Sequence, residues 1–174
     1  MVSFNPSRVI KHTLFLMLLT LFVCGMVVGG FAAAGQGTFQ VSLEGYGSLP
    51  GQLLNVILQP DGSVSMAMTI NSNIKTSLGA FPVTATGSWT GTQNGSALSG
   101  TIQNIIGKVQ ICVFGSCGTA NFIGKGNWTG SIINSAANGT FSGTITFTNT
   151  PYQQQLPANV PIPISGTWNA EIPQ

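Results

Sequence analysis

Charged side chains are scarce in this sequence, and their scarcity limits what the protein can do. Asp, Glu, Lys and Arg together make up 5% of the 174 residues, against roughly 25% in an ordinary soluble domain. Two of the five basic residues, Arg8 and Lys11, lie in the first twelve positions, as does the single histidine, His12. Residues 35–174 therefore contain no arginine and no histidine, and keep three acidic and three basic side chains: Glu44, Asp61, Lys75, Lys108, Lys125 and Glu171.

These absences exclude most of the residue sets on which catalysis and cofactor binding depend. General acid–base chemistry near neutral pH usually uses histidine or a carboxylate tuned by a neighbour, and glycoside hydrolysis uses a pair of carboxylates. Zinc sites use Cys and His clusters, calcium sites use several carboxylates, and nucleic-acid surfaces use many Lys and Arg. The sequence therefore predicts a protein that is not an enzyme, with no catalytic residue, metal site, cofactor or nucleic-acid partner.

The first 34 residues have the pattern of an export signal. Basic residues precede an uncharged, mostly apolar run over 13–34 that ends in three alanines, Ala32 to Ala34. Such a pattern is typical of a signal peptide, here cut after Ala34. The run is also long enough to cross a bilayer as a helix, so a retained N-terminal membrane anchor is the alternative. Both interpretations place residues 35–174 outside the cytoplasm, secreted or at the cell surface, because the basic side stays inside.

Two cysteines remain after this segment, Cys112 and Cys117, separated by four residues that include Gly115. An even number of cysteines in an exported chain predicts a disulfide, here across a tight hairpin. Three Asn-x-Ser/Thr sequons, at Asn94, Asn127 and Asn138, are candidate glycosylation sites if the host glycosylates. Asn94 and Asn138 each precede a glycine, so both are expected to lie in turns.

The three tryptophans of the chain share one pattern, in which a glycine stands two residues before each Trp. Trp89, Trp128 and Trp168 are 39 and 40 residues apart, and a fixed period of this length is typical of repeat architectures. We predict about three 40-residue repeats over 52–91, 92–130 and 131–170. Each tryptophan shares its strand face with Phe, Val or Ile. This favours a core position, with glycine making room for the indole, over an exposed platform for a ligand.

Alternation of apolar and polar residues predicts strands throughout residues 35–174. Gly, Pro, Asn and Asp mark turns at Gln59–Gly62, Asn94-Gly95 and Asn134–Gly139. Pro161 and Pro163 indicate that the first half of the last strand is an edge or is barely paired. The predicted fold is a single all-β antiparallel sandwich or barrel of about 8–10 strands, preceded by the N-terminal apolar helix. The predicted strands are 38–44, 52–59, 63–70, 81–92, 98–103, 108–114, 120–130, 140–148 and 162–172.

Two known families share parts of this pattern. Gly-x-Trp followed by a turn and Gly-Thr resembles the strand starts of calycin-type barrels. The spacing of the three tryptophans is similar to that of ricin-type β-trefoils, although glycine stands here where that family has glutamine and the carbohydrate-binding Asp is missing. Each resemblance covers a few residues per repeat, so neither assigns the chain to a family.

Residues 35–47 fall outside the threefold pattern and contain an alternating strand with Phe39, Val41 and Leu43 on one face. Two interpretations stay open for this segment. It can be the first strand of the same domain, or a donor strand that pairs with the sheet of a neighbouring subunit and gives a polymer by strand addition. Near-zero net charge over 35–174 favours self-association.

Three functions follow from these observations. The first is a non-catalytic secreted or cell-surface protein with a structural, adhesive or filament-forming role, whose partners are further copies or other cell-envelope proteins. The second is an extracellular domain that binds a carbohydrate or a small apolar ligand through aromatic faces. The third is an outer-membrane β-barrel. Two features argue against it, because the outward faces are rich in Thr and Ser and the chain does not end in an aromatic residue.

Overall fold

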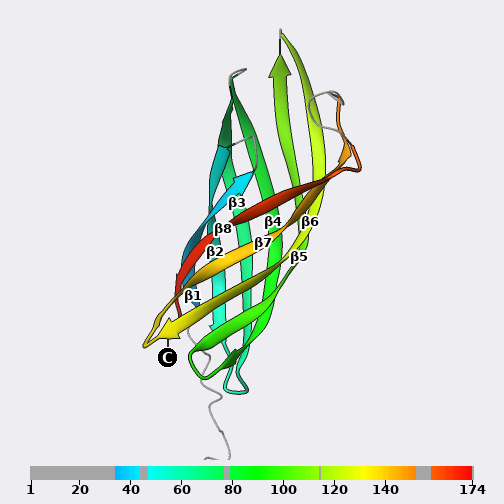
Figure 1. Cartoon of the computed structure of the whole chain (residues 1–174). Coiled ribbons are helices and arrows are strands. Elements are labelled where there is room, and N and C mark those ends of the chain that lie inside the picture. Colours follow the sequence, from blue (N-terminus) through cyan, green and yellow to red (C-terminus); the bar gives the residue numbers. More distant parts are fainter. Residues whose placement is uncertain (1–33, 44–46, 77–78, 114, 152–157, 174) are drawn as a thin grey trace, which may run out of the picture. The chain divides into compact units, whose positions relative to one another are not determined.

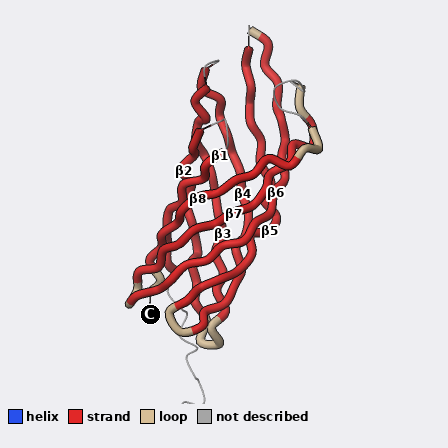
Figure 2. The backbone as a smooth tube through the Cα atoms, viewed as in Figure 1, coloured by secondary structure: helices blue, strands red, loops and turns tan. Residues whose placement is uncertain are grey.

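A computed structural model describes residues 34–43, 47–76, 79–113, 115–151 and 158–173 of the chain. In these residues the chain forms eight antiparallel strands that close into one barrel (Figure 1). Figure 2 shows that strands account for most of the described backbone and that loops lie at the strand ends. The strands are β1 (Gly35–Leu43), β2 (Gly47–Leu58), β3 (Ser63–Thr76), β4 (Gly79–Asn94), β5 (Ala97–Val113), β6 (Ser116–Ile133), β7 (Ala136–Asn149) and β8 (Pro161–Glu171).

The topology is an up-and-down meander in which every strand pairs with its neighbours in sequence. Closure comes from the pairing of β1 with β8, from Gly37 opposite Ala170 to Leu43 opposite Ile164. Of the two folds that the sequence predicts, a sandwich or a barrel, the structure has the barrel. The predicted N-terminal helix and the apolar run up to residue 33 lie outside the described residues. Among those that are described, no helix is long and apolar enough to cross a membrane.

The predicted parity of the strands is confirmed by burial. Inward positions carry apolar side chains or glycine, and outward positions carry mainly Ser, Thr, Asn and Gln. The buried side chains form one cluster that runs through the barrel interior, and all of them are apolar. At roughly 25 cal/mol per Å² of apolar surface removed from water, this core is the main source of stability.

The two strands predicted over 98–103 and 108–114 are in fact one strand, β5. A bulge at Asn104, which has a φ of 53°, shifts the register of β5 against β6 between Ile102 and Ile105. Both isoleucines are buried although they are three residues apart. The bulge therefore shifts the alternation of buried and exposed positions by one residue. In the sequence, this shift looks like the end of one strand and the start of another.

Two turns differ from the prediction. Asn94 pairs with Ala97, so the central residues of that turn are Gly95 and Ser96, with Gly95 at a φ of 60°. A positive φ at the first central residue suits glycine. The turn predicted over Asn134–Gly139 is only two residues long, since Ile133 pairs with Ala136 and Asn134 takes a φ of 57°.

Two hairpins extend past their neighbours at one end of the barrel, seen at the top of Figure 1. The β3–β4 hairpin pairs as far as Thr76 and Gly79, whereas β2 stops pairing with β3 at Thr69. The β5–β6 hairpin pairs as far as Val113 and Ser116. We call this the finger end, and the opposite end, with the β2–β3, β4–β5 and β6–β7 turns, the turn end.

The prolines of β8 lie where the prediction placed them. Pro161 and Pro163 pair with β7, while β1 reaches only as far as Ile164 along β8. The first three residues of β8 are therefore an edge, which accommodates residues that cannot donate a backbone hydrogen bond.

Candidate functional site

All three tryptophans lie in the barrel interior, with exposed fractions of 1–2%. They form one aromatic cluster with Phe39 of β1 and Phe141 of β7. Trp89 is its centre, with ring centroids 5.4–6.2 Å from those of the other four members. These positions agree with the interpretation of the tryptophans as core residues and leave no indole face on the outside of the barrel.

Two of the tryptophans are held in the same way. Trp128 on β6 lies opposite Gly100 of β5, extends to Gly91 of β4 and donates from Nε1 to the backbone oxygen of Thr90 at 3.2 Å. A Cβ on Gly91 would lie 2.6 Å from Cζ2 of that indole. Glycine is therefore required on two neighbouring strands for one indole to cross them.

Trp168 repeats this arrangement two strands further round the barrel. It lies opposite Gly139 of β7, extends to Gly130 of β6 and donates to the backbone oxygen of Thr129 at 3.1 Å. The glycine two residues after a tryptophan thus makes room for the next tryptophan and not for its own neighbour. This refines the sequence interpretation, in which each glycine served the tryptophan beside it.

Trp89 departs from the pattern. Its partner across β3 is Met66, not glycine, and its Nε1 is buried with no hydrogen-bond partner among the described residues. Two of the three Gly-x-Trp segments therefore share one geometry. The threefold repeat itself stays a prediction.

Cys112 and Cys117 lie opposite each other on β5 and β6, with their sulfur atoms 2.15 Å apart. The predicted disulfide therefore joins the two strands near the tip of the β5–β6 hairpin. Beyond Val109 on β5 and Asn121 on β6, this hairpin pairs with no other described strand. The bond closes a two-stranded ribbon at the point where the sheet no longer supports it.

The three sequon asparagines are all exposed. Asn94 ends β4 at the β4–β5 turn, as expected. Asn138 lies inside β7 and not in a turn, because β7 begins two residues before it. Asn127 lies within β6 on its outward face. Glycosylation at these positions stays a prediction.

Phe39 and Val41 are buried and Leu43 is partly buried in the core. Their strand, β1, is hydrogen-bonded within its own chain to β2 on one side and to β8 on the other. This is the arrangement expected of a first strand of the same domain. Donation of this strand to a neighbour would require β1 to leave its own barrel. Ala34, the predicted cleavage residue, is exposed and directly precedes β1.

The outer wall carries rows of uncharged polar side chains that run across all eight strands. Neighbouring positions in such a row are about 4.8 Å apart across strands, and successive outward positions are about 6.7 Å apart along a strand. Several make hydrogen bonds within the wall, such as Gln40 to Ser48 at 2.9 Å. One row consists of Ser65, Thr90, Thr101, Asn127, Ser142, Ser165, Ser42 and Ser48.

The described charged side chains are spread over this wall. Asp61 lies in the β2–β3 turn, and Glu171 ends β8, both at the turn end. Lys75, Lys108 and Lys125 lie on β3, β5 and β6. In the part of the chain that the structure describes, no three His, Cys, Asp or Glu residues lie close enough to hold a metal ion. Hydrogen bonds from the backbone and hydroxyl of Ser63 lower the pKa of Asp61, whose Oδ1 accepts from the Ser63 backbone N–H at 2.8 Å.

Comparison with protein-family models, with curated proteins and with solved structures found no match to this chain. The class of the protein is therefore defined by its own fold and surface. It is an up-and-down antiparallel β-barrel with an aromatic core and a wall of uncharged polar side chains. Because the interior is occupied by its own side chains, the candidate functional surface is the outer wall.

Proposed function

We propose that this protein is a non-catalytic, exported β-barrel with a structural or filament-forming role at the cell surface. The observation that carries the proposal is the contrast between the two sides of the barrel wall. The inner side is filled with apolar and aromatic residues. The outer side presents hydroxyl and amide groups with five described charges.

The distribution of reactive groups supports a role without chemistry. The two described carboxylates, Asp61 and Glu171, both belong to exposed positions on different parts of the turn end. Catalytic carboxylates and lysines commonly have pKa values shifted by burial or by a close charged partner. Hydrogen bonds from Ser63 within the β2–β3 turn lower the pKa of Asp61. That is the usual chemistry of an Asx turn.

The same contrast weighs against the outer-membrane alternative. A transmembrane barrel presents an apolar band to lipid and commonly a polar interior. Here the sides are reversed, since the buried residues are apolar and the outward rows consist mainly of Ser, Thr, Asn and Gln. In the described residues the exposed large aliphatic side chains are Ile106 on β5, Ile123 and Ile133 on β6, and Val160 just before β8, so they do not form a band around the barrel.

The rows on the outer wall favour one second candidate function, adhesion to a polyhydroxylated polymer. Regular hydroxyl and amide groups can exchange hydrogen bonds with such a polymer without charge or aromatic stacking. Among the residues that the structure describes, the aromatic faces that a sugar site could use all lie in the core. In this candidate function the glycan is bound by the polar rows of the wall. Co-sedimentation with insoluble polysaccharides would detect this binding, and its absence for every polymer tested would remove this candidate.

The experiment that tests the main proposal is the native assembly state. The full chain is expressed for export, extracted from the cell surface under mild conditions, and examined by negative-stain microscopy and sedimentation velocity. We expect polymers or concentration-dependent oligomers in the surface fraction. Protein found only in the cytoplasm, or only as a monomer at every concentration, would contradict the proposal.

A further inference from the structure

Three of the four exposed large aliphatic side chains of the described barrel occur in two patches with lysine or glutamate beside them. The first patch, which we call the lysine patch, lies on β5 and β6. Ile106 and Ile123 are direct cross-strand partners on the outer face and are 63% and 52% exposed. Lys108 and Lys125 follow two residues after each of them, on the same face of their strands.

Because β5 and β6 are antiparallel, the two lysines lie on opposite sides of the isoleucine pair. Lys108 lies toward the finger end and Lys125 toward the turn end, each about 6.7 Å from its isoleucine along the strand. Most outward positions of the barrel carry Ser, Thr, Asn or Gln. An apolar pair placed directly across two strands, bracketed by two of the three described lysines, is therefore an unusual feature of this wall.

The second patch, the glutamate patch, lies at the turn end. Ile133 of β6, which is 68% exposed, pairs with Ala136 of β7, and Ala136 pairs with Glu171 of β8. These three exposed residues form one row across three strands. The patch thus presents apolar side chains beside a carboxylate, where the lysine patch presents apolar side chains beside two ammonium groups.

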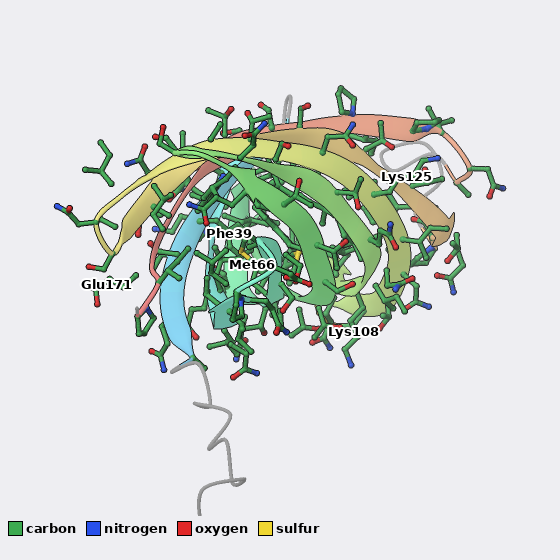
Figure 3. The ribbon with its side chains drawn as sticks, turned by 90° about the horizontal axis from the view of Figure 1, so that it is seen from below. Phe39, Met66, Lys108, Lys125 and Glu171 are labelled. Atoms are coloured by element: carbon green, nitrogen blue, oxygen red, sulfur yellow. A yellow bond between two sulfur atoms is a disulfide. The ribbon has the colours of Figure 1, made fainter. Side chains whose placement is uncertain are left out.

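The two patches cannot meet within one molecule. Figure 3, which views the barrel from the turn end, shows Glu171 on one side of the barrel and Lys108 and Lys125 on the other. Any contact between a lysine patch and a glutamate patch must therefore join two copies of the chain. Such a contact uses different surfaces on the two copies, so it is heterologous and leaves one free patch on each end of the pair.

We infer that the lysine patch of one copy binds the glutamate patch of the next, and that copies of this chain join head to tail through these two surfaces. The inference rests on the proposed filament-forming role and names the contact that builds the filament. Opposite charge selects the pairing, since lysine patch against lysine patch would place like charges together. The isoleucines supply the apolar area that exposed ion pairs alone do not.

The contact is small compared with a stable interface, which buries about 1,200–2,000 Å² in total. Each single contact is therefore weak and depends on a high local concentration of copies, such as export to one surface produces. Electrostatic contacts between exposed groups are screened by salt. Assembly should consequently decrease as the ionic strength rises.

The test is a charge swap between two variants of the full chain. Each variant is expressed for export and purified with whatever processing the host carries out. The first variant carries Lys108→Glu and Lys125→Glu, so both of its patches are acidic. The second carries Glu171→Lys, so both of its patches are basic. We expect each variant alone to associate at least about tenfold more weakly than the wild type, and an equimolar mixture to regain association. Lys75→Glu, a charge reversal on β3 outside both patches, is the control and should associate like the wild type.

The outcomes separate the contact from the proposed function. If wild type assembles and both variants assemble equally well alone, the contact is wrong while the filament-forming role stands. Loss of assembly in both variants without recovery in the mixture would also overturn the contact. A wild type that stays monomeric at every concentration would remove the filament-forming role as well. A double variant that carries both Ile123→Thr and Ile133→Thr keeps every charge, removes apolar area from both patches and should associate more weakly than the wild type. Association equal to that of the wild type would contradict the apolar part of the contact.

Discussion

The indole Nε1 of Trp168 donates a hydrogen bond of 3.1 Å to the backbone oxygen of Thr129, which lies two strands away on β6. The ring reaches that carbonyl because Gly139 and Gly130 leave the intervening surface of the sheet bare. Trp128 and Thr90 repeat the relationship two strands earlier. The aromatic core is therefore built from indoles that cross neighbouring strands, and the glycines that the sequence repeats are the positions they cross.

Replacement of Gly130 by alanine should destabilise the barrel. The added Cβ would lie 2.5 Å from Cζ2 of Trp168 and would also contact the backbone oxygen of Asn138, neither of which can move freely. Overpacking of this kind costs about 1–3 kcal/mol, measured as a shift in the urea midpoint at unchanged m-value. Gly87→Ala is the matched control, since its nearest neighbours are the flexible side chain of Met68 at 3.1 Å and Ile105 at 3.3 Å. Equal losses of stability in the two variants would contradict the crossing geometry.

Substitution of the tryptophans by phenylalanine should rank them by their hydrogen bonds. Trp168→Phe removes the donor to Thr129, whereas Trp89→Phe removes a buried Nε1 that has no partner among the described residues. An unpaired buried donor is itself unfavourable. We therefore expect Trp89→Phe to cost about 1 kcal/mol less than Trp168→Phe in chemical denaturation. The reverse order would show that the environments of the two indoles are assigned wrongly.

Removal of the disulfide should loosen the finger end without unfolding the barrel. In a Cys112→Ser, Cys117→Ser double variant, the short closed loop limits the loss to roughly 2 kcal/mol in the chain-entropy model. Because this ribbon pairs with no other described strand beyond Val109 and Asn121, amide exchange should rise over residues 110–120. Exchange in β7 and β8 should stay as in the wild type. A uniform rise throughout the barrel would contradict the independence of the ribbon.

Asp61 should make the stability of the barrel depend on pH in the acid range. The pKa of Asp61 is lowered in the folded state by the Ser63 hydrogen bonds. Its contribution is therefore present above the pKa of the unfolded chain and is lost as the pH falls through the folded pKa. Asp61→Asn should flatten the curve of melting temperature against pH below about pH 4. A larger acid-induced loss in the variant than in the wild type would contradict this sign.

Much of the fold is predictable from the sequence because the two faces of each strand differ so clearly. The alternation of buried Phe81, Val83 and Ala85 with exposed Pro82, Thr84 and Thr86, for example, shows which face is buried. Paired prolines in β8 indicated an edge, and the structure has one there. Two cysteines with four residues between them predict a bond between neighbouring strands of one hairpin, and their sulfur atoms are at bonding distance.

Other features depend on contacts that local patterns do not contain. Closure of the barrel pairs Phe39 with Trp168, which lie near opposite ends of the described chain. Alternation within each strand contains no information about this pairing, so it does not distinguish a sandwich from a barrel. Asn104, at the bulge, takes a left-handed conformation. Asparagine tolerates this conformation but also occurs in many others, so its presence in the sequence does not predict a bulge. The lysine and glutamate patches cannot be predicted from the sequence for the same reason. Ile106 and Ile123, for example, become neighbours only through the register of β5 with β6.

The three tryptophans lie in the core, and we propose that the outer wall is the functional surface. Tryptophan fluorescence of the folded protein, with acrylamide as quencher, tests this most directly. We predict blue-shifted emission, protection from the quencher until the protein unfolds, and no change on addition of sugars or small apolar ligands. Emission typical of exposed indole, or a ligand-dependent shift in the native state, would contradict the core position of the tryptophans. It would instead indicate that they form a binding site.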